Sequence, residues 1–182
     1  MFKDLDKVEL KSKVSYLPEG VHTVKIMELS TSEQRENYKG TPYTEFKVQN
    51  QQGIAYLRMS GYDDNTSEAA KDIRNKIFKG FLVAAGATSF AHVPTACREV
   101  LGNVIEVCLG TREYWTNDKE TGEPVIRKVT EYKTAAPKGH GLQYDPQYNR
   151  TLSEKDQAAY KAAHDAYINA NSSAVADEDL PF

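Results

Sequence analysis

The chain has 182 residues, of which 40% are hydrophobic and 27% charged, a size and composition typical of one folded domain with appended segments. No apolar run approaches the roughly 20 residues that span a bilayer, and the N-terminal residues lack a signal-peptide core, so we expect an intracellular, cytoplasmic protein with no membrane partner. The formal net charge is −3, and Asp177, Glu178 and Asp179 account for it, so the rest of the chain is neutral and compatible with a local basic stripe.

Three short strands are predicted in the first third of the chain. Residues 20–29 alternate apolar Val24 and Ile26 with polar neighbours, as expected for a half-buried strand. Beyond a polar loop, residues 42–49 and 54–60 form two more strands, joined by turn-forming residues that end in a glycine.

Alternation along the second and third strands assigns each side chain to one face of the sheet. Phe46 and Leu57 belong to the inward sets. The outward residues are Tyr43, Glu45, Lys47, Tyr56 and Arg58. A register error of one residue would reverse every one of these assignments.

A helix is predicted next, beginning after capping residues at 65–67 and ending near Gly86. Its apolar residues recur at helical spacing and comprise Ile73, Ile77, Phe81 and either Val83 or Leu82. Residues 94–101 predict a second short helix, which Gly102 ends.

Two further strands complete the body. An apolar strand begins at Val104 and continues through residues 112–115, turns at a polar tip over residues 117–124, and returns over residues 125–133. The order β-β-β-α-β-β is that of a five-stranded OB barrel with a helix between strands three and four. We therefore predict a mainly β fold, with an OB-fold barrel over residues 20–133 and an N-terminal arm over residues 1–19.

The C-terminal residues predict appendages to this body. Residues 134–176 begin as a linker, in which residues 142–150 could lie extended on the barrel, and contain a helix at 151–169 with Ser153 and Asp156 at capping-box spacing. The predicted apolar stripe of this helix consists of Leu152, Tyr160, Ala163 and Tyr167. A homo-oligomer built through the helix is one hypothesis.

The C-terminal tip, residues 177–182, carries the sharpest functional signal. Three carboxylates precede an apolar end that also bears the terminal carboxylate. Such a peptide cannot fold alone, and we expect a disordered tail that suits a pocket with a basic rim and an apolar floor. The tip resembles that of bacterial single-stranded DNA-binding proteins. This implies a docking site for replication and recombination proteins made of Asp177, Glu178, Asp179, Leu180, Pro181 and Phe182.

Two motifs in the body also have counterparts in a known family. The first motif ends the predicted helix and is Phe-Leu-Val-Ala-Ala-Gly at residues 81–86. The second begins the next predicted strand and is Leu-Gly-Asn-Val at residues 101–104. Over roughly residues 20–133 the body resembles OB-fold single-stranded DNA-binding proteins of bacteriophages. The resemblance implies non-catalytic, largely sequence-independent binding and protection of single-stranded DNA during phage DNA replication, recombination and repair, in the host cell cytoplasm.

Binding of single strands needs aromatic faces for the bases and cations for the phosphates. Strands two and three and the loops after strands one and four form the usual OB ligand face. The candidate DNA-binding residues are Tyr38, Lys39, Tyr43, Lys47, Tyr56, Arg58, Arg112, Tyr114, Trp115, Lys119, Arg127 and Lys128. Packing is the alternative role for Tyr43, Tyr56 and Trp115, and pairing with Glu45 is the alternative for Lys47 and Arg58.

No catalytic site, metal site or cofactor is predicted, and the two cysteines predict no disulfide. The histidines and cysteines lack the close spacing of zinc ligands; they are His22, His92, His140, His164, Cys97 and Cys108. Two alternative functions remain. One is an OB-fold adaptor that binds RNA or protein, and the other is a small metal-dependent nuclease that uses Asp63 and Asp64.

Overall fold

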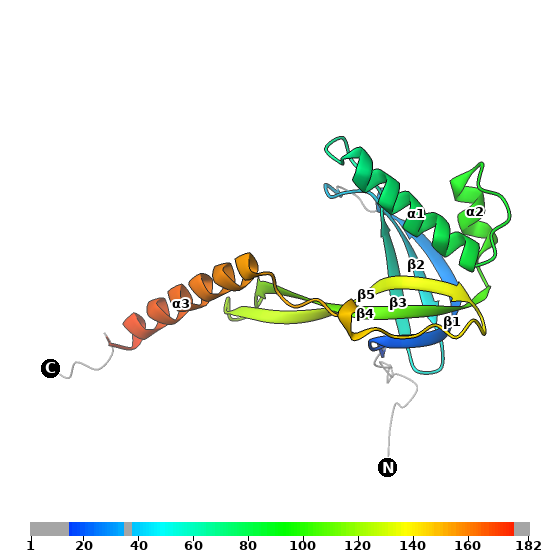
Figure 1. The fold of residues 1–182 in the computed structure, drawn as a ribbon. Helices are drawn as coiled ribbons and strands as arrows, with labels where there is room; N and C mark the ends of the chain where they lie inside the picture. The colour runs from blue at the N-terminus through cyan, green and yellow to red at the C-terminus, as the bar shows by residue number, and fades with distance from the viewer. Residues whose placement is uncertain (1–14, 35–37, 177–182) are drawn as a thin grey trace, which may run out of the picture.

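The computed structural model describes residues 15–34 and 38–176. These residues form a mainly β fold with one antiparallel sheet in the order β3-β2-β1-β4-β5 (Figure 1). The strands are β1 Gly20–Thr31, β2 Tyr43–Gln49, β3 Ile54–Ser60, β4 Val104–Asn117 and β5 Pro124–Pro137. The helices are α1 Glu68–Ala84, α2 Val93–Glu99 and α3 Glu154–Ala176, with short 3₁₀ turns η2 Ser32–Gln34 and η3 Pro146–Tyr148.

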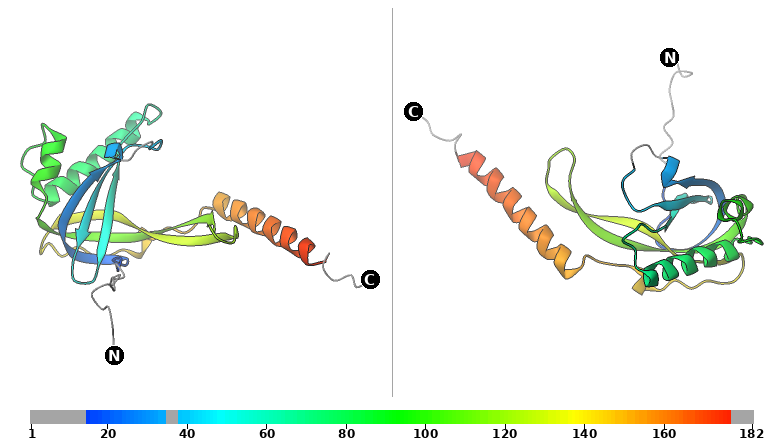
Figure 2. Two further views of the ribbon diagram at one scale, coloured as in Figure 1. Left: turned by 180° about the vertical axis from the view of Figure 1, so that it is seen from behind. Right: turned by 90° about the horizontal axis from the view of Figure 1, so that it is seen from above.

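The predicted order of three strands, two helices and two strands is confirmed. The strand pairings form an open sheet, in which β1 lies between β2 and β4 and the outer strands are β3 and β5. Figure 1 and the left view of Figure 2 show β2 and β3 crossing over the long β4–β5 pair, with α1 and α2 at one end of the sheet.

The core forms where the inner face of the sheet meets the last turns of α1. Val24, Ile26, Phe46 and Leu57 are fully buried, as alternation predicts. The ring of Phe81 from α1 lies 4.7 Å from that of Phe46, centroid to centroid. Burial of each such side chain contributes roughly 1.5–3 kcal/mol, so these contacts fix the helix on the sheet.

The apolar residues at helical spacing in α1 are only partly buried. The helix begins as expected, because the hydroxyl of its N-cap Ser67 accepts the Ala70 N–H at 3.3 Å. Phe81 and Leu82 are buried, whereas the side chains of three other predicted residues are exposed: Ile73, Ile77 and Val83. The buried face instead continues from Phe81 to Phe78. Contact with the core begins at Phe78, so Ile73 and Ile77 precede it, and Val83 is on the exposed side of the last turn.

Strand β5 extends further than the sequence suggests. Ala135 and Ala136 pair with Val107 and Glu106 of β4, where a linker is predicted. Small side chains fit there, because Ala136 is buried in the sheet. The following residues are also held, since the Glu106 carboxylate accepts three backbone N–H groups at 2.8–2.9 Å, from Gly139, Gly141 and Leu142.

The chain then runs along β4, although residues 146–148 form η3 and so the segment 142–150 is not extended throughout. The Asn149 side chain accepts the Thr111 N–H at 2.9 Å, and the Arg150 N–H donates to the Thr111 carbonyl at 2.8 Å. Gly110 makes this approach possible, because a Cβ at that position would lie 2.6 Å from the Tyr148 carbonyl oxygen. The C-terminal segment is therefore built onto the sheet through η3.

Helix α3 is longer than the predicted helix at 151–169 and begins three residues later. Ser153 caps it, since its hydroxyl accepts the Asp156 N–H at 3.2 Å. Leu152 is buried, and Tyr160 contacts Trp115 of β4 at 6.5 Å between ring centroids. The Tyr167 hydroxyl also donates to the Thr121 carbonyl at 3.4 Å, and beyond these contacts α3 projects from the sheet (Figure 2).

No strand pairing joins β3 to β5 within the described ranges, and residues 15–17 lie at this seam instead. The Leu17 N–H donates to the Ile54 carbonyl at 2.7 Å, and the Ile54 N–H donates to the Ser15 carbonyl at 2.9 Å. From the other side, the Thr130 hydroxyl donates to the Leu17 carbonyl at 3.4 Å. The end of the predicted N-terminal arm therefore belongs to the body.

Across the part of the chain that the structure describes, none of the helices has the length and apolar character needed to cross a membrane.

Candidate nucleic-acid interface

An open groove of about 800 Å³ lies between β3 and the adjoining part of β4 and β5. Tyr56 and Arg58 line it from β3, and Arg112, Lys128 and Glu131 line it from β4 and β5. Four of the twelve predicted DNA-binding residues therefore meet in one groove, although they come from positions far apart in the sequence.

Two tyrosine rings form the aromatic part of the groove. Tyr56 has 44% of its surface exposed, and its ring lies 6.5 Å from that of the still more exposed Tyr16, centroid to centroid. The sequence pattern misses Tyr16, because only the backbone pairing to Ile54 brings it here. Gly53 permits that pairing, since a Cβ at Gly53 would lie 2.3 Å from the Ser15 carbonyl oxygen.

Tyr43 shares the outer face with Tyr56 but is not open to a ligand. Its side chain is only 4% exposed. The Arg58 guanidinium carbon lies 4.2 Å from the Tyr43 ring centroid, and the Tyr38 ring meets it edge-on at 5.3 Å. The expectation of an outward, available ring is therefore wrong for Tyr43, because neighbours on the same face cover it.

Arg58 also neutralises a buried carboxylate. Its Nη2 lies 2.7 Å from Oε2 of Glu45, whose side chain is buried. The pairing with Glu45 considered from sequence is thus present for Arg58, whereas Lys47 pairs with Glu28 at 2.7 Å instead. About half of the Arg58 side chain remains exposed beside the groove.

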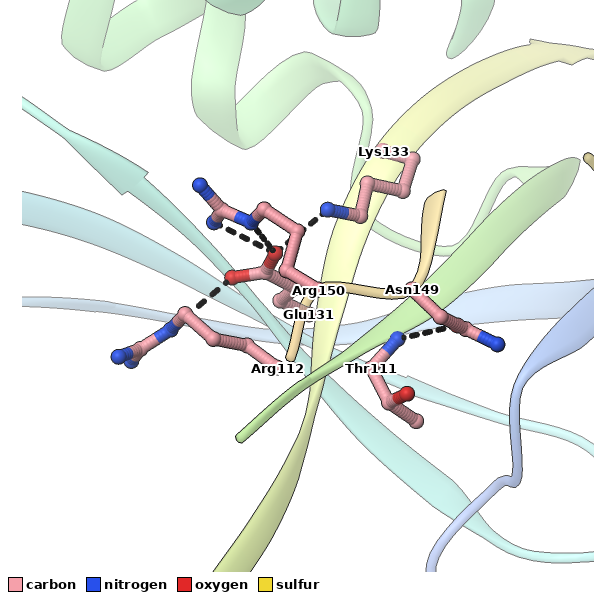
Figure 3. Close-up of polar contacts among 6 residues, drawn as sticks. All are labelled: Thr111, Arg112, Glu131, Lys133, Asn149 and Arg150. Atoms are coloured by element: carbon pink, nitrogen blue, oxygen red, sulfur yellow. Dashed lines mark hydrogen bonds and ion pairs between the residues drawn. The ribbon is translucent and has the colours of Figure 1, made fainter. Parts of the chain in front are cut away.

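The second wall carries a cluster of cations around Glu131 (Figure 3). Oε1 of Glu131 accepts hydrogen bonds from Lys133 and from Nε and Nη2 of Arg150, the latter two at 3.0 and 2.6 Å. Oε2 of Glu131 lies 3.4 Å from Nε of Arg112. Sequence reasoning does not single out Lys133 or Arg150, because the fold of the C-terminal segment is what brings Arg150 to β5.

The charge of Glu131 follows from these contacts. Burial raises the pKa of its carboxyl, but the hydrogen bonds from Lys133 and Arg150, and their charges, act in the opposite direction and leave the pKa below its usual value. Glu131 is therefore a carboxylate at neutral pH. One negative charge faces three positive ones, and the cluster keeps an excess of about two positive charges.

The remaining predicted residues lie around the groove or along the β4–β5 hairpin. Lys47 pairs across the strands with Tyr56, and Tyr114 lies beneath Arg112, whose guanidinium carbon is 5.9 Å from its ring centroid. Trp115 packs against α3, as described above, and the exposed Lys119 and Arg127 are on the hairpin, where Arg127 pairs with Asp118 at 2.9 Å. Tyr38 and Lys39 are exposed in the loop before β2.

The carboxylates considered for a nuclease take part in a turn. Asp63 accepts hydrogen bonds from the Thr41 and Thr66 hydroxyls at 3.1 and 2.9 Å and from the Asn65 N–H at 3.1 Å. The hydrogen bonds from Thr66 and Thr41 are the main cause of its lowered pKa. No group of three or more potential metal ligands is found in the described residues.

The predicted partner-docking tip lies outside the described residues, so its six residues add nothing to this geometry. In comparisons with known proteins, the chain matches no family model and no curated sequence.

Proposed function

We propose that this chain is a non-catalytic single-stranded DNA-binding protein with an OB-type barrel. The strand order β3-β2-β1-β4-β5, with α1 between β3 and β4, is the order such a barrel has when its outer strands approach each other. The observation that carries the proposal is the groove at that seam, in which exposed tyrosine rings and cations lie within reach of one ligand.

The chemistry of this groove suits an unpaired strand. Each base has a π-face that can stack on Tyr56 or Tyr16, and such stacking contributes about 1–3 kcal/mol per base. A duplex hides these faces inside its own stack. Because stacking does not depend on base identity, the binding is expected to be largely independent of sequence. The proposed role in DNA replication, recombination and repair is supported by the resemblance of residues 81–86 and 101–104 to phage proteins.

The cations supply a salt-dependent part of the affinity. Arg58, Arg112 and Lys128 line the groove, and phosphates would compete for them with the carboxylates that they now contact: Glu45, Glu131 and Glu113. Each phosphate contact to a single strand adds about 0.7 to the salt slope. Three contacts give a slope of log K against log salt of about −2 or steeper.

The test is a titration of labelled oligonucleotides followed by fluorescence anisotropy, at several salt concentrations. Single-stranded DNA should bind more tightly than a duplex of the same sequence, independently of base composition, and with the slope given above. Equal or better binding of single-stranded RNA would favour the adaptor alternative. Cleavage of the DNA in the presence of Mg²⁺ would favour the nuclease, and no preference for single strands would overturn the proposal.

The proposal includes a second site, the acidic tip at residues 177–182. Its supporting observation is the sequence itself, which places three carboxylates before Leu-Pro-Phe. A segment with that chemistry would recruit replication and recombination proteins while the proposed barrel holds DNA.

A further inference from the structure

We propose that Arg112 and Arg150 form a binding site for one internal phosphodiester of the strand, at the rim of the groove. This inference rests on the proposed function, and it names one position where the protein would contact the DNA backbone. Glu131 is the positioning residue of the site, since its carboxylate contacts both arginines, and Lys133 bonds to Glu131 in turn.

The backbone around Arg150 is held on both sides, which distinguishes it from a flexible surface arginine. Its N–H donates to the Thr111 carbonyl, and its carbonyl accepts the Glu113 N–H, both at 2.8 Å. These bonds form a parallel bridge between Arg150 and Arg112. Two arginines from distant parts of the chain therefore start from adjacent backbone positions and meet the same carboxylate (Figure 3).

The excess positive charge around Glu131 would attract an anion. Within the described part of the chain, Glu131 is the one carboxylate that lies within 4.0 Å of Arg112, Arg150 or Lys133. Lys133 is largely buried and already bonded to Glu131, so the excess charge resides on the two arginines. Arg150 has 60% of its side chain exposed, and Arg112 about half.

The donors at the Nη end of Arg112 match a phosphate. Glu131 occupies Nε of Arg112, and Figure 3 shows the Nη end of that side chain turned away from the carboxylate. A planar guanidinium binds two phosphate oxygens at once, which a lysine cannot do. Arg112 also lines the groove that contains Tyr56, so the phosphate it holds would belong to the same strand whose bases reach the rings.

An arginine-to-glutamine pair of variants provides the first test. Arg150→Gln removes a charge from the site, and Arg98→Gln removes one from an exposed position in α2. We expect Arg150→Gln to weaken binding of single-stranded DNA about five- to ten-fold at low salt and to reduce the salt slope by about 0.7. Arg98→Gln should change neither quantity, and Arg150→Lys should restore the slope but only part of the affinity.

Glu131→Gln separates a ligand site from a purely structural ion cluster. If phosphate competes with Glu131 for the arginines, removal of the negative charge should strengthen DNA binding several-fold. A structural cluster would instead lose thermal stability with no gain in affinity. Melting curves of every variant, recorded without DNA, allow binding to be measured at a temperature where each variant is folded.

Strands with one neutral methylphosphonate linkage locate the contact. Moving the linkage along the oligonucleotide should reveal one position where it weakens wild-type binding but has no further effect on Arg150→Gln. An effect confined to strands with a terminal 5′-phosphate would overturn the internal site in favour of end recognition. If the wild type binds single-stranded DNA, and Arg150→Gln has the same affinity and salt slope as Arg98→Gln, then this inference fails while the proposed function stands. If the wild type does not bind single strands, the proposed function fails as well.

Discussion

The exposure of single rings decides which tyrosines can stack on a base. Tyr43 and Tyr56 lie on the same outer face of β2 and β3, since their cross-strand partners are Ser60 and Lys47. Arg58 and Tyr38 cover Tyr43, whereas Tyr56 remains 44% exposed and lines the groove. Tyr56 is therefore the ring whose removal should matter most for binding, and Tyr43 is a support for Arg58.

Replacement of Tyr56 by alanine tests this assignment. We expect Tyr56→Ala to weaken single-stranded DNA binding by about 1–3 kcal/mol, which is the contribution of one stacked base. Stability should change by no more than about 0.5 kcal/mol, because the side chain is at the surface. Tyr62→Ala is the matched control, since Tyr62 is 48% exposed and lies near Lys71 of α1, outside the groove. Equal affinities of the two variants, measured by anisotropy, would remove the stacking role.

Sequence alternation predicts the face of a residue but not what covers it. It places Tyr56 and Arg58 correctly on the outside, and it also places Tyr43 there, where a loop tyrosine and a cross-strand arginine then bury it. Tyr16 and Arg150 are not predicted at all, because long-range contacts determine where they lie. Their positions depend on pairings with Ile54 and Arg112, which no local pattern contains.

At the scale of elements, the carboxylate of Glu106 connects β4 to residues 139–142, which follow the end of β5. Glu106 is buried on β4 and accepts three backbone N–H groups of residues 139–142. The hydrogen bond from Leu142 is the largest cause of its lowered pKa, and burial acts against it. Because residues 142–150 bring Arg150 to Glu131 and Arg112, this anchor connects stability to the proposed site.

The lowered pKa sets the sign of a pH dependence. A group whose pKa is lower in the folded than in the unfolded chain stabilises the fold above its ordinary value, 4.5 for this glutamate, and loses that effect as the pH falls through the folded pKa. Thermal unfolding should therefore show Glu106→Gln less stable than wild type at pH 7, with a difference that shrinks below pH 4.5. Glu120→Gln, at an exposed hairpin position, should behave like wild type at every pH. A difference for Glu106→Gln that is constant with pH would contradict the anchor.

The order of elements follows from the sequence, but their ends depend on contacts. Strand β3 has the predicted bounds, because alternation and turn residues define both ends. Strand β5 continues through Ala-Ala-Pro, residues of low strand propensity that β4 nevertheless pairs. In α1, the apolar residues Ile73 and Ile77 indicate a helix but not its burial, since contact with the core begins at Phe78.

At the scale of the whole molecule, the groove and the end of the described chain are separated. Helix α3 packs on the β4–β5 hairpin through Tyr160 and Tyr167 and ends at Ala176, at the end of the helix distant from the sheet (Figure 2). The excess of acidic residues follows after it, in residues 177–179. This arrangement suits a division in which the groove binds DNA and the acidic tip binds proteins.

Loss of Phe182 should weaken the binding of partner proteins but not the binding of single-stranded DNA. In the proposed docking mode Phe182 fills the apolar floor of a partner pocket, so Phe182→Ala should abolish capture of replication proteins by the immobilised protein. Affinity for single-stranded DNA should stay the same or rise, because the described rings and cations that line the groove are left in place. Removal of all six residues should have the same effect on partners and should leave DNA affinity unchanged or higher, since it removes −3 in side-chain charge. Asn171→Ala, an exposed position in α3, is the control. Retention of the same replication proteins by the truncated chain would show that they bind elsewhere, and the folded body would then have to contain their site.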